Sequence, residues 1–479
     1  MIKKESILTT KIVPLSTLQL FYLALGGFGV QFSISCVMNN ASGLFKLLGV
    51  TDTMISLLWL IAPLSGLFIQ PVMGQFSDLV NTRYGKRSPF IFVGMLLSVF
   101  SLIILVFLEW VWCYVLAILL LNCSINCINE ALRSLIGDLT AKEQRIAAFA
   151  WQTALGGVGA MLASMAPWLL ESIGIFVAPD ASHLKIPIVM KITFLLSAII
   201  LFKTIMRMLR NVQEPVEPSS INTDKGDFIY LSRSFKFIRL ILSELLNNLT
   251  NVPRVIKKYF LVQCFVWAGM FCVWLYLGIA IAQHIYGLPV TANVEENLAY
   301  KQLLHEGMVT AGILIAIYQA TSIPCVIILP MLTRKFSADK IHASSLLVGS
   351  FSLLVIVITN NLIYIYIAMV GMGVMWGSLC TLPYVSITSE LPSGKMGTYL
   401  GIFNMTVTIP QIICGMSIGF INKYVFFNHA INTIGLASLM LAIAGIILID
   451  QETSLIKTYF IWANKIIKHM AFIVRKNKL

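Results

Sequence analysis

The chain has 479 residues, of which 58% are hydrophobic and only 11% are charged. A soluble domain carries about 25% charged residues, so this composition excludes an ordinary soluble protein. Apolar runs of about 20 residues recur along the chain, and each is long enough to cross roughly 30 Å of hydrocarbon. A soluble protein would need to bury several helices of that length in one chain. The composition therefore indicates a polytopic helical membrane protein.

Twelve apolar runs are expected to span the membrane. The first follows a charged and polar start, MIKKESILTTKIVPLS, and lacks the small-residue cleavage pattern of a signal peptide. We therefore expect it to be the first span rather than a cleaved leader. The predicted spans are 17–38, 54–76, 89–108, 111–132, 146–170, 187–208, 258–284, 307–330, 341–358, 361–386, 397–421 and 427–449.

The cations predict the orientation of these spans. With both termini in the cytoplasm, 28 of the 34 lysines and arginines fall on the cytoplasmic side. This asymmetry is the positive-inside pattern of membrane proteins. The net charge of +13 is thereby explained by topology, and no nucleic-acid partner is needed.

A polar stretch divides the spans into six and six. Residues 209–257 begin with a proline- and serine-rich, loop-like sequence, and their later part has the composition of a basic amphipathic helix. The sequence thus predicts a first bundle (1–208), a cytoplasmic linker (209–257), a second bundle (258–449) and a basic amphipathic tail (450–479). The last 25 residues are expected to lie as a helix on the anionic inner leaflet.

The two halves also resemble each other weakly. LRSLIGDL (132–139) aligns with YVSITSEL (384–391), which places Asp138 over Glu390 at the inner end of each half's fourth span. Internal repeats of this kind are typical of transporters that rock two bundles about a site at the membrane midplane.

A charged motif, GQFSDLVNTRYGKRSPF (74–90), follows the second span. Topology alone accounts for its cations, but it does not account for an aspartate four residues after a glycine. Gly74 permits close helix approach, and Asp78 can accept hydrogen bonds from a neighbouring helix N-terminus or pair with a cation. We interpret the segment as a conformational gate formed by Gly74, Asp78, Arg83, Gly85, Lys86 and Arg87.

This motif resembles the inner-loop signature of the major facilitator superfamily. Its long interval from aspartate to glycine is most similar to that of sucrose transporters and their glycoside–pentoside–hexuronide relatives. Other segments agree with the same group, whereas PMLTRKFSADK (330–340) matches the superfamily signature only loosely. The agreeing segments are GVQF (29–32), LLGV (47–50), WLIAPLSGLFIQPVMGQFSD (59–78), ALRSLIGDL (131–139) and GIFNMTVTIPQIICG (401–415).

The resemblance implies the major facilitator fold, an all-α polytopic protein with twelve transmembrane helices in two six-helix bundles. It further implies secondary active transport of a small polar solute, with a sugar as the leading class and protons as the coupling ion. The alternatives are an uncoupled facilitator of another solute and a non-transporting sensor that retains the fold. We expect the chain to lie in a bacterial inner membrane.

Charge within the spans is scarce, which draws attention to the fourth span. Glu130 and Arg133 are three residues apart, share a helix face and can therefore pair. Each charge costs about 2.5–3.5 kcal/mol near a helix centre on insertion scales, so a lipid-facing pair is disfavoured. The alternative is that Arg133 lies at the membrane boundary and extends to water. If Arg133 does not extend to water, both Glu130 and Arg133 face a polar cavity between the helices.

One position departs from the resembled group. Plant sucrose transporters carry an aspartate eleven residues before the arginine that Arg133 matches, and here that position is Asn122. An asparagine cannot carry the proton, so proton coupling must rest on Glu130 or on another acid, or be absent; Glu130 is the candidate. Arg133 is expected to bind the solute.

Amide and aromatic side chains supply further candidates. Amides suit sugar hydroxyls, so we expect Gln31, Asn126, Asn404 and Gln411 to bind solute, with Asn39 as a weaker candidate. Trp59, Trp267, Trp274 and Trp376 can stack on sugar rings, although aromatic residues in spans more often pack or anchor at interfaces.

Other classes of protein lack support in the sequence. No Gly-rich phosphate loop or HExxH pair is present, so an enzyme is not expected. The nine cysteines lie in or beside apolar spans and are interpreted as packing residues. Neither a metal nor another cofactor is expected.

Overall fold

The computed structural model describes residues 14–50, 54, 58–80, 82–172, 186, 188–215, 243–245, 247–291, 297–392 and 394–450. Most of the expected linker and the whole tail from residue 451 lie outside these ranges, as does the side chain of Asn39. Within them, helices carry almost all of the ordered backbone, and the single β-bridge joins Thr82 to Gly85. The expected all-α class is confirmed.

Twelve long helices account for the twelve expected spans, together with a short 3₁₀ turn at Lys142–Gln144 and a π-helical turn at Ile421–Val425. The helices are α1 (Thr17–Leu47), α3 (Ile61–Leu79), α4 (Ser88–Phe107), α5 (Val111–Leu139), α6 (Arg145–Ser172), α7 (Ile188–Asn211), α10 (Arg254–His284), α11 (Leu298–Leu332), α12 (Ala338–Ile358), α13 (Leu362–Glu390), α14 (Met396–Phe420) and α15 (Ala430–Ile449).

Eleven of these helices are long and apolar enough to span a membrane by their own composition. The exception is α3, whose sequence IAPLSGLFIQPVMGQFSDL includes Gln70, Gln75 and Asp78. Inside a membrane a helix satisfies its own backbone, but polar side chains need partners supplied by other helices. Helix α3 meets this condition because it packs against both α5 and α14.

Local sequence explains several helix ends. Ser337 caps α12 by accepting a hydrogen bond from the backbone N–H of Lys340 at 3.4 Å, and Asn361 caps α13 by accepting from Ile363 at 2.9 Å. Helix α4 starts with a proline in its first turn, where no intrahelical N–H is lost. Several helices extend past their expected ends, among them α1, which continues to Leu47, and α5, which continues to Leu139.

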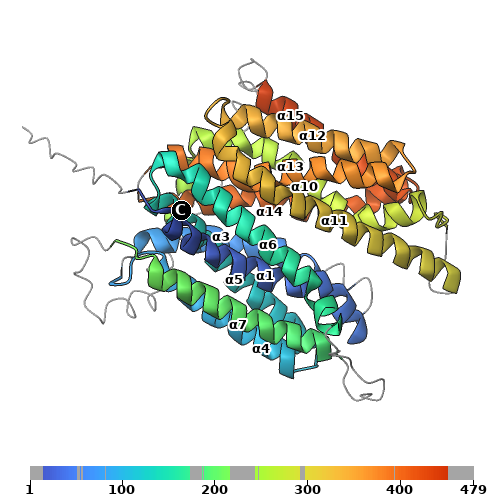
Figure 1. Cartoon of the computed structure of the whole chain (residues 1–479), viewed down its shortest axis with the longest axis horizontal. Helices are drawn as coiled ribbons and strands as arrows, with labels where there is room; N and C mark the ends of the chain where they lie inside the picture. Colours follow the sequence, from blue (N-terminus) through green and yellow to red (C-terminus); the bar gives the residue numbers. More distant parts are fainter. Residues whose placement is uncertain are drawn as a thin grey trace, which may run out of the picture.

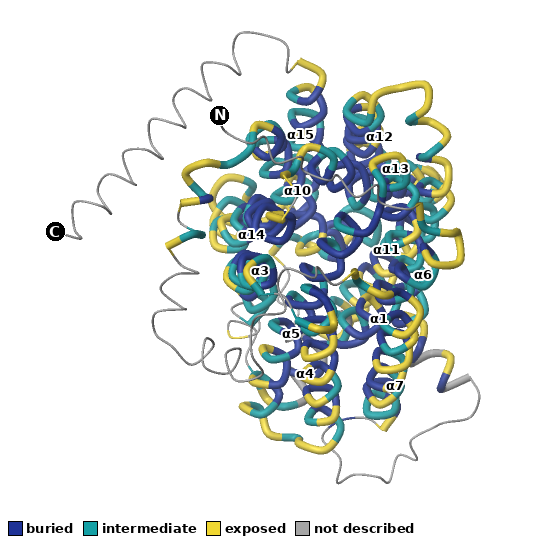
Figure 2. Tube along the Cα trace, turned by 90° about the vertical axis from the view of Figure 1, so that its left-hand side faces the viewer, coloured by how far each residue is buried: buried dark blue, intermediate teal, exposed yellow. Residues whose placement is uncertain are grey.

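The helices form two bundles, which we call the first bundle (α1 and α3 to α7) and the second bundle (α10 to α15). Contacts within each bundle are extensive, and contacts between the bundles involve two main helix pairs, α3 with α14 and α6 with α11. Figure 2 shows the bundles stacked, with these pairs on opposite sides of the middle layer. In Figure 1, α6 and α11 lie together near one end of the molecule and separate toward the other.

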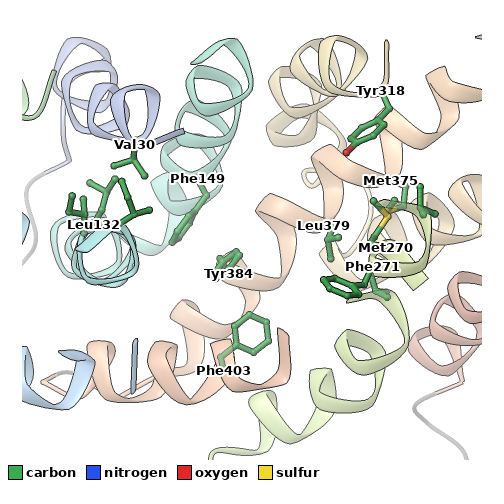
Figure 3. Close-up of a cluster of buried hydrophobic side chains, with 14 of the residues drawn as sticks. Val30, Leu132, Phe149, Met270, Phe271, Tyr318, Met375, Leu379, Tyr384 and Phe403 are labelled. Carbon is green, nitrogen blue, oxygen red and sulfur yellow. The ribbon is translucent and has the colours of Figure 1, made fainter. Parts of the chain in front are cut away.

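Buried aromatic side chains fill the layer between the bundles. Tyr384 of α13 stacks on Phe149 of α6 with ring centroids 5.9 Å apart, and its edge meets Phe403 of α14 at 5.4 Å. Figure 3 shows Phe149 and Tyr384 facing each other between the group around Leu132 and the group around Met270. The apolar contact therefore continues from one bundle into the other.

Glycines allow α3 and α14 to approach backbone to backbone. A Cβ at Gly74 would overlap the carbonyl oxygen of Gly397, and a Cβ at Gly401 would lie 2.6 Å from Pro71 Cα. The proposal from sequence that Gly74 permits close helix approach agrees with this packing, which follows the general use of small residues between membrane helices.

We predict that Gly74→Ala lowers the thermal unfolding midpoint of the purified protein, because its methyl group meets rigid backbone. Overpacking of this kind costs about 1–3 kcal/mol. The control is Gly419→Ala on the partner helix α14, where nothing lies within 4 Å of an added Cβ. Equal midpoints for the two variants would contradict the close approach.

Candidate functional site

Asp78, at the end of α3, binds the beginning of α14 across the gap between the bundles. Its Oδ2 accepts hydrogen bonds from the backbone N–H and the hydroxyl of Thr398, both at 2.6 Å. Its Oδ1 accepts the backbone N–H of Gly397 at 3.1 Å. The first N–H groups of a helix lack intrahelical acceptors and carry partial positive charge, so a carboxylate is a favourable partner for them.

Arg87 neutralises the same carboxylate from the side of the first bundle. Its guanidinium contacts Asp78 Oδ1 and Ser77 Oγ, and its Nε donates to Asp138 Oδ2 at 3.0 Å. Burial lowers the pKa of Arg87, but the carboxylates of Asp138 and Asp78 outweigh it and raise that pKa above the usual value. Arg87 therefore stays charged while it holds the ends of α3 and α5 to the start of α4.

The loop before α4 is shaped around Glu214. This carboxylate accepts the backbone N–H groups of Lys86 at 2.7 Å, of Arg87 at 2.9 and 3.0 Å, and of Ser88 at 3.1 Å. Gly85 has a φ of +100°, and a Cβ there would overlap the Glu214 carboxylate. Glycine at this position is thus required by both the turn and the contact.

The three expected gate cations therefore have different positions. Arg87 lies 99% buried in the charged cluster, whereas Arg83 is exposed and donates to the hydroxyl of its neighbour Tyr84 at 2.6 Å. Lys86 takes part through its backbone bond to Glu214. We call Gly74, Asp78, Arg87, Asp138 and the Gly397–Thr398 turn the Asp78 junction.

A second polar link between the bundles involves Arg145 at the start of α6. Its Nη2 donates to the carbonyl of Gly137 at 3.0 Å, near the end of α5, and its Nη1 donates to the carbonyl of Thr388, near the end of α13. A cation at helix C-termini complements the anion at the start of α14. In the sequence, Arg145 is indistinguishable from a cation placed by topology, so its role was missed.

Glu130 is 99% buried in α5, and among the described residues no arginine side chain forms an ion pair with it. Its Oε1 accepts a hydrogen bond from the Ser134 hydroxyl at 3.2 Å, and its Oε2 has no hydrogen-bond partner among the described residues. A buried polar atom without a partner is rare in folded proteins and costs free energy.

Arg133 does not pair with Glu130, so the expected side-chain pair is absent within 4.0 Å in the described structure. Its guanidinium instead lies 4.5 Å from the ring centroid of Tyr384, on α13 of the second bundle. Residues three apart lie on neighbouring, not identical, directions of a helix, and Arg133 extends toward the interface where an aromatic face is available. It therefore contacts the other bundle and does not lie in lipid.

An amide cluster lies between α3, α5 and α14. Asn126 accepts a hydrogen bond from Gln70 Nε2 at 2.5 Å and donates to Ser65 Oγ at 2.9 Å. Asn404 Nδ2 lies 3.5 Å from the carbonyl oxygen of Gly66. The structure thus brings together Asn126 and Asn404, two of the predicted amides. It adds Gln70, whose Oε1 has no hydrogen-bond partner in the described part of the chain.

The remaining predicted side chains occupy other positions. Gln411 is buried on α14, two turns beyond Asn404. Gln31 is exposed on α1, near Gly156 of α6, and no hydrogen bond joins it to the amide cluster. Asn122 donates to the carbonyl of Ile118 at 2.8 Å within its own helix.

Three of the four predicted tryptophans come together in the second bundle. Trp376 has its ring centroid 6.0 Å from that of Trp267, 5.9 Å from that of Trp274 and 5.7 Å from that of Tyr318. Trp59 lies apart, between α1, α3 and α5, beside Met38 and Asn122.

Comparisons with known proteins agree on one family. A model of the Major Facilitator Superfamily matches residues 23–415. The general alpha-glucoside permease of Schizosaccharomyces pombe is 26% identical over 290 residues, which are 56% of this chain and 50% of that protein. Sucrose transport protein SUC4 of Arabidopsis thaliana is 22% identical over 435 residues, which are 82% of this chain and 81% of that protein.

Solved structures with the same fold include the E. coli fucose:proton symporter FucP, with a TM-score of 0.63 and 13% identity over 91% of this chain and 98% of that one. The proton:xylose symporter XylE bound to 6-bromo-6-deoxy-D-glucose also has a TM-score of 0.63, with 14% identity over 90% of this chain and 94% of that one. At these identities the likeness establishes the fold alone.

We predict that Arg87→Lys lowers the thermal unfolding midpoint, because lysine keeps the charge but cannot reach Asp78, Asp138 and Ser77 together. A hydrogen bond to a charged group contributes about 1.5–3 kcal/mol, and at least one is lost. Arg83→Lys is the matched control in the same loop and should leave the midpoint unchanged. A similar decrease in both variants would show that the Arg87 fork is not a specific stabilising contact.

Proposed function

Because the chain belongs to the Major Facilitator Superfamily, we propose that it transports a sugar across a membrane in a proton-coupled, alternating-access cycle. Two of the similar proteins are a general alpha-glucoside permease and a sucrose transport protein. Two solved structures of the same fold are proton symporters for fucose and xylose. An alpha-glucoside or sucrose-like disaccharide is therefore the first substrate class to test.

The observation that carries this proposal is the arrangement of Glu130 and Arg133. A carboxylate with an unsatisfied oxygen is buried one turn from an arginine whose charged end contacts the opposite bundle. Burial favours the protonated carboxyl group, and an approaching arginine favours the ionised one. Movement of Arg133 between Tyr384 and Glu130 can therefore link proton binding to the relative position of the bundles.

The cycle follows from that link. With Glu130 protonated, Arg133 is released to the interface, where it can donate to solute hydroxyls beside Asn126 and Asn404. When the bundles separate at the Asp78 junction, water enters and Arg133 returns to the ionised carboxylate, which releases both proton and solute. The arrangement with Arg133 against Tyr384 corresponds to the protonated stage. Gln31 and Gln411 are assigned to further solute contacts at a later or earlier stage, when the bundles have moved.

The Asp78 junction is the proposed gate, and we place it at the cytoplasmic side. The excess of cations at this side, with both termini, supports that orientation. The division into bundles at 1–208 and 258–449, joined by a linker at 209–257, belongs to the same proposal. A bacterial inner membrane is the proposed location.

Uptake by proteoliposomes separates this function from its alternatives. Accumulation of labelled sucrose or maltose driven by an imposed pH gradient supports a symporter, whereas equilibration without accumulation supports a facilitator. Binding without flux indicates a sensor that retains the fold. Chemical change of the sugar would contradict the expectation that the chain is not an enzyme.

We predict that Asp78→Asn slows transport about tenfold or more and leaves equilibrium binding of the solute nearly unchanged. Loss of the negative charge weakens bonds to Arg87 and to the start of α14, each worth about 1.5–3 kcal/mol. Transport rates and binding isotherms are measured on the same preparation. Asp339→Asn is the control, since Asp339 binds Lys258 and Tyr259 within one bundle. Parallel loss of solute binding would place Asp78 in the substrate site and overturn the gate.

We predict that Glu130→Gln abolishes pH-driven accumulation and preserves solute counterflow. Glutamine imitates the protonated carboxyl group permanently, so the bundles can still exchange solute but no proton is carried. Both assays are run on the same proteoliposomes at matched protein content, with Glu109→Gln as a control for a carboxylate outside the interface. Normal pH-driven accumulation in Glu130→Gln would show that another group carries the proton.

A further inference from the structure

A short helical segment preceding α10 lies against the Asp78 junction. Two of its residues bind the same α3 side chain: Glu244 Oε2 accepts a hydrogen bond from Gln75 Nε2 at 2.8 Å, and Asn248 Nδ2 donates to Gln75 Oε1 at 3.0 Å. Gln75 Oε1 also lies 2.9 Å from the hydroxyl oxygen of Thr398, on α14, whose single hydrogen it shares with Asp78. The segment thereby joins a polar network that already includes both bundles.

Asn248 reaches both sides of the interface. In addition to its bond with Gln75 of the first bundle, its Oδ1 accepts a hydrogen bond from Lys395 Nζ at 3.1 Å, immediately before α14 of the second bundle. Asn248 is 96% buried, although its neighbour Asn247 is exposed. Leu245 and Leu249 from the same segment pack against the hydrophobic core.

The other described end of the connection between the bundles is attached to the same region. Glu214 accepts the backbone N–H groups at the beginning of α4, directly beside Arg87. The described parts at 212–215, 243–245 and 247–253 therefore all belong to a connection that contacts the loops and helix ends of the Asp78 junction. The connection contributes side chains to the gate in addition to linking the bundles in sequence.

We propose that residues 243–245 and 247–250 form a strap that stabilises the closed Asp78 junction, with Asn248 as its positioning residue. The proposal rests on the proposed alternating-access cycle. When the bundles separate, Asn248 must lose either Gln75 or Lys395, because one belongs to each side. The bonds of Asn248 connect amides to each other and to one lysine, and water can replace them. The strap thus shifts the equilibrium toward the closed junction without preventing the junction from opening.

The separation of the bundles can be measured without a sugar. Spin labels at Glu143→Cys, beside the start of α6, and Lys335→Cys, just after α11, occupy exposed positions on opposite bundles at the junction end. Double electron–electron resonance in nanodiscs, in a background without other reactive cysteines, then gives the ratio of separated to closed molecules. Because sugar uptake is not the readout, failure of the transport proposal and failure of the strap are distinguishable.

Asn248→Ala is expected to raise that ratio about fivefold or more, since about 1 kcal/mol is lost for each hydrogen bond. Asn247→Ala is the matched control on the exposed side of the same segment and should not change the ratio. If Asn248→Ala yields no folded monomer, Lys395→Met tests the same bridge with an expected increase of about two- to fivefold. An unchanged ratio in the folded variant, or equal changes in Asn248→Ala and Asn247→Ala, would overturn the strap.

Discussion

The contact of one carboxylate with both bundles is the constraint on which the rest of the structure depends. Asp78 is held by Arg87 on its own bundle and by the first N–H groups of α14 on the other. If Arg87 or the start of α14 moves away, the Asp78 carboxylate loses a partner and the departing N–H donors are left unsatisfied. Both changes are unfavourable unless water enters and replaces the lost hydrogen bonds. In the proposed cycle the junction alternates between this dry, closed arrangement and a hydrated, open one.

Helix α5 connects the Asp78 junction to Glu130 and Arg133, which lie within the membrane-spanning part. Helix α5 carries Asp138 at its end, where it binds Arg87, and carries Arg133 five residues and Glu130 eight residues earlier. A rigid helix transmits a change at either position to the other, because its residues move together. This is a shared element that both sites can bias, as coupling between distant sites requires. The Tyr384 ring, packed between Phe149 and Phe403, gives Arg133 a defined position on the opposite bundle.

Sequence patterns predicted the features that follow from the membrane itself. The length of the apolar runs predicted the twelve helices. The spacing of Gly74 and Asp78 predicted a close helix approach at Gly74 and a helix N-terminus bound by Asp78, and both are observed. Tertiary partners could not be predicted, because a single sequence does not record which helices meet. Thus Arg145 has the sequence context of a cation placed by topology, and Glu214 that of a loop residue. Arg133 was expected to pair with Glu130, whereas its guanidinium lies against the Tyr384 ring of the second bundle. The superfamily resemblance is confirmed, while the roles of the site residues stay proposals.

The most direct measurement is a reversible cross-link across the closed interface. Thr153 of α6 and Thr381 of α13 lie in different bundles with their hydroxyl oxygens 3.1 Å apart, outside the groups assigned to solute or proton. Cysteines at both positions place their sulfur atoms near bonding distance. The account predicts that oxidation stops sugar flux in proteoliposomes and that a reductant restores it, because the bundles must separate there once in every cycle. Full flux with a complete cross-link would contradict alternating access at this interface.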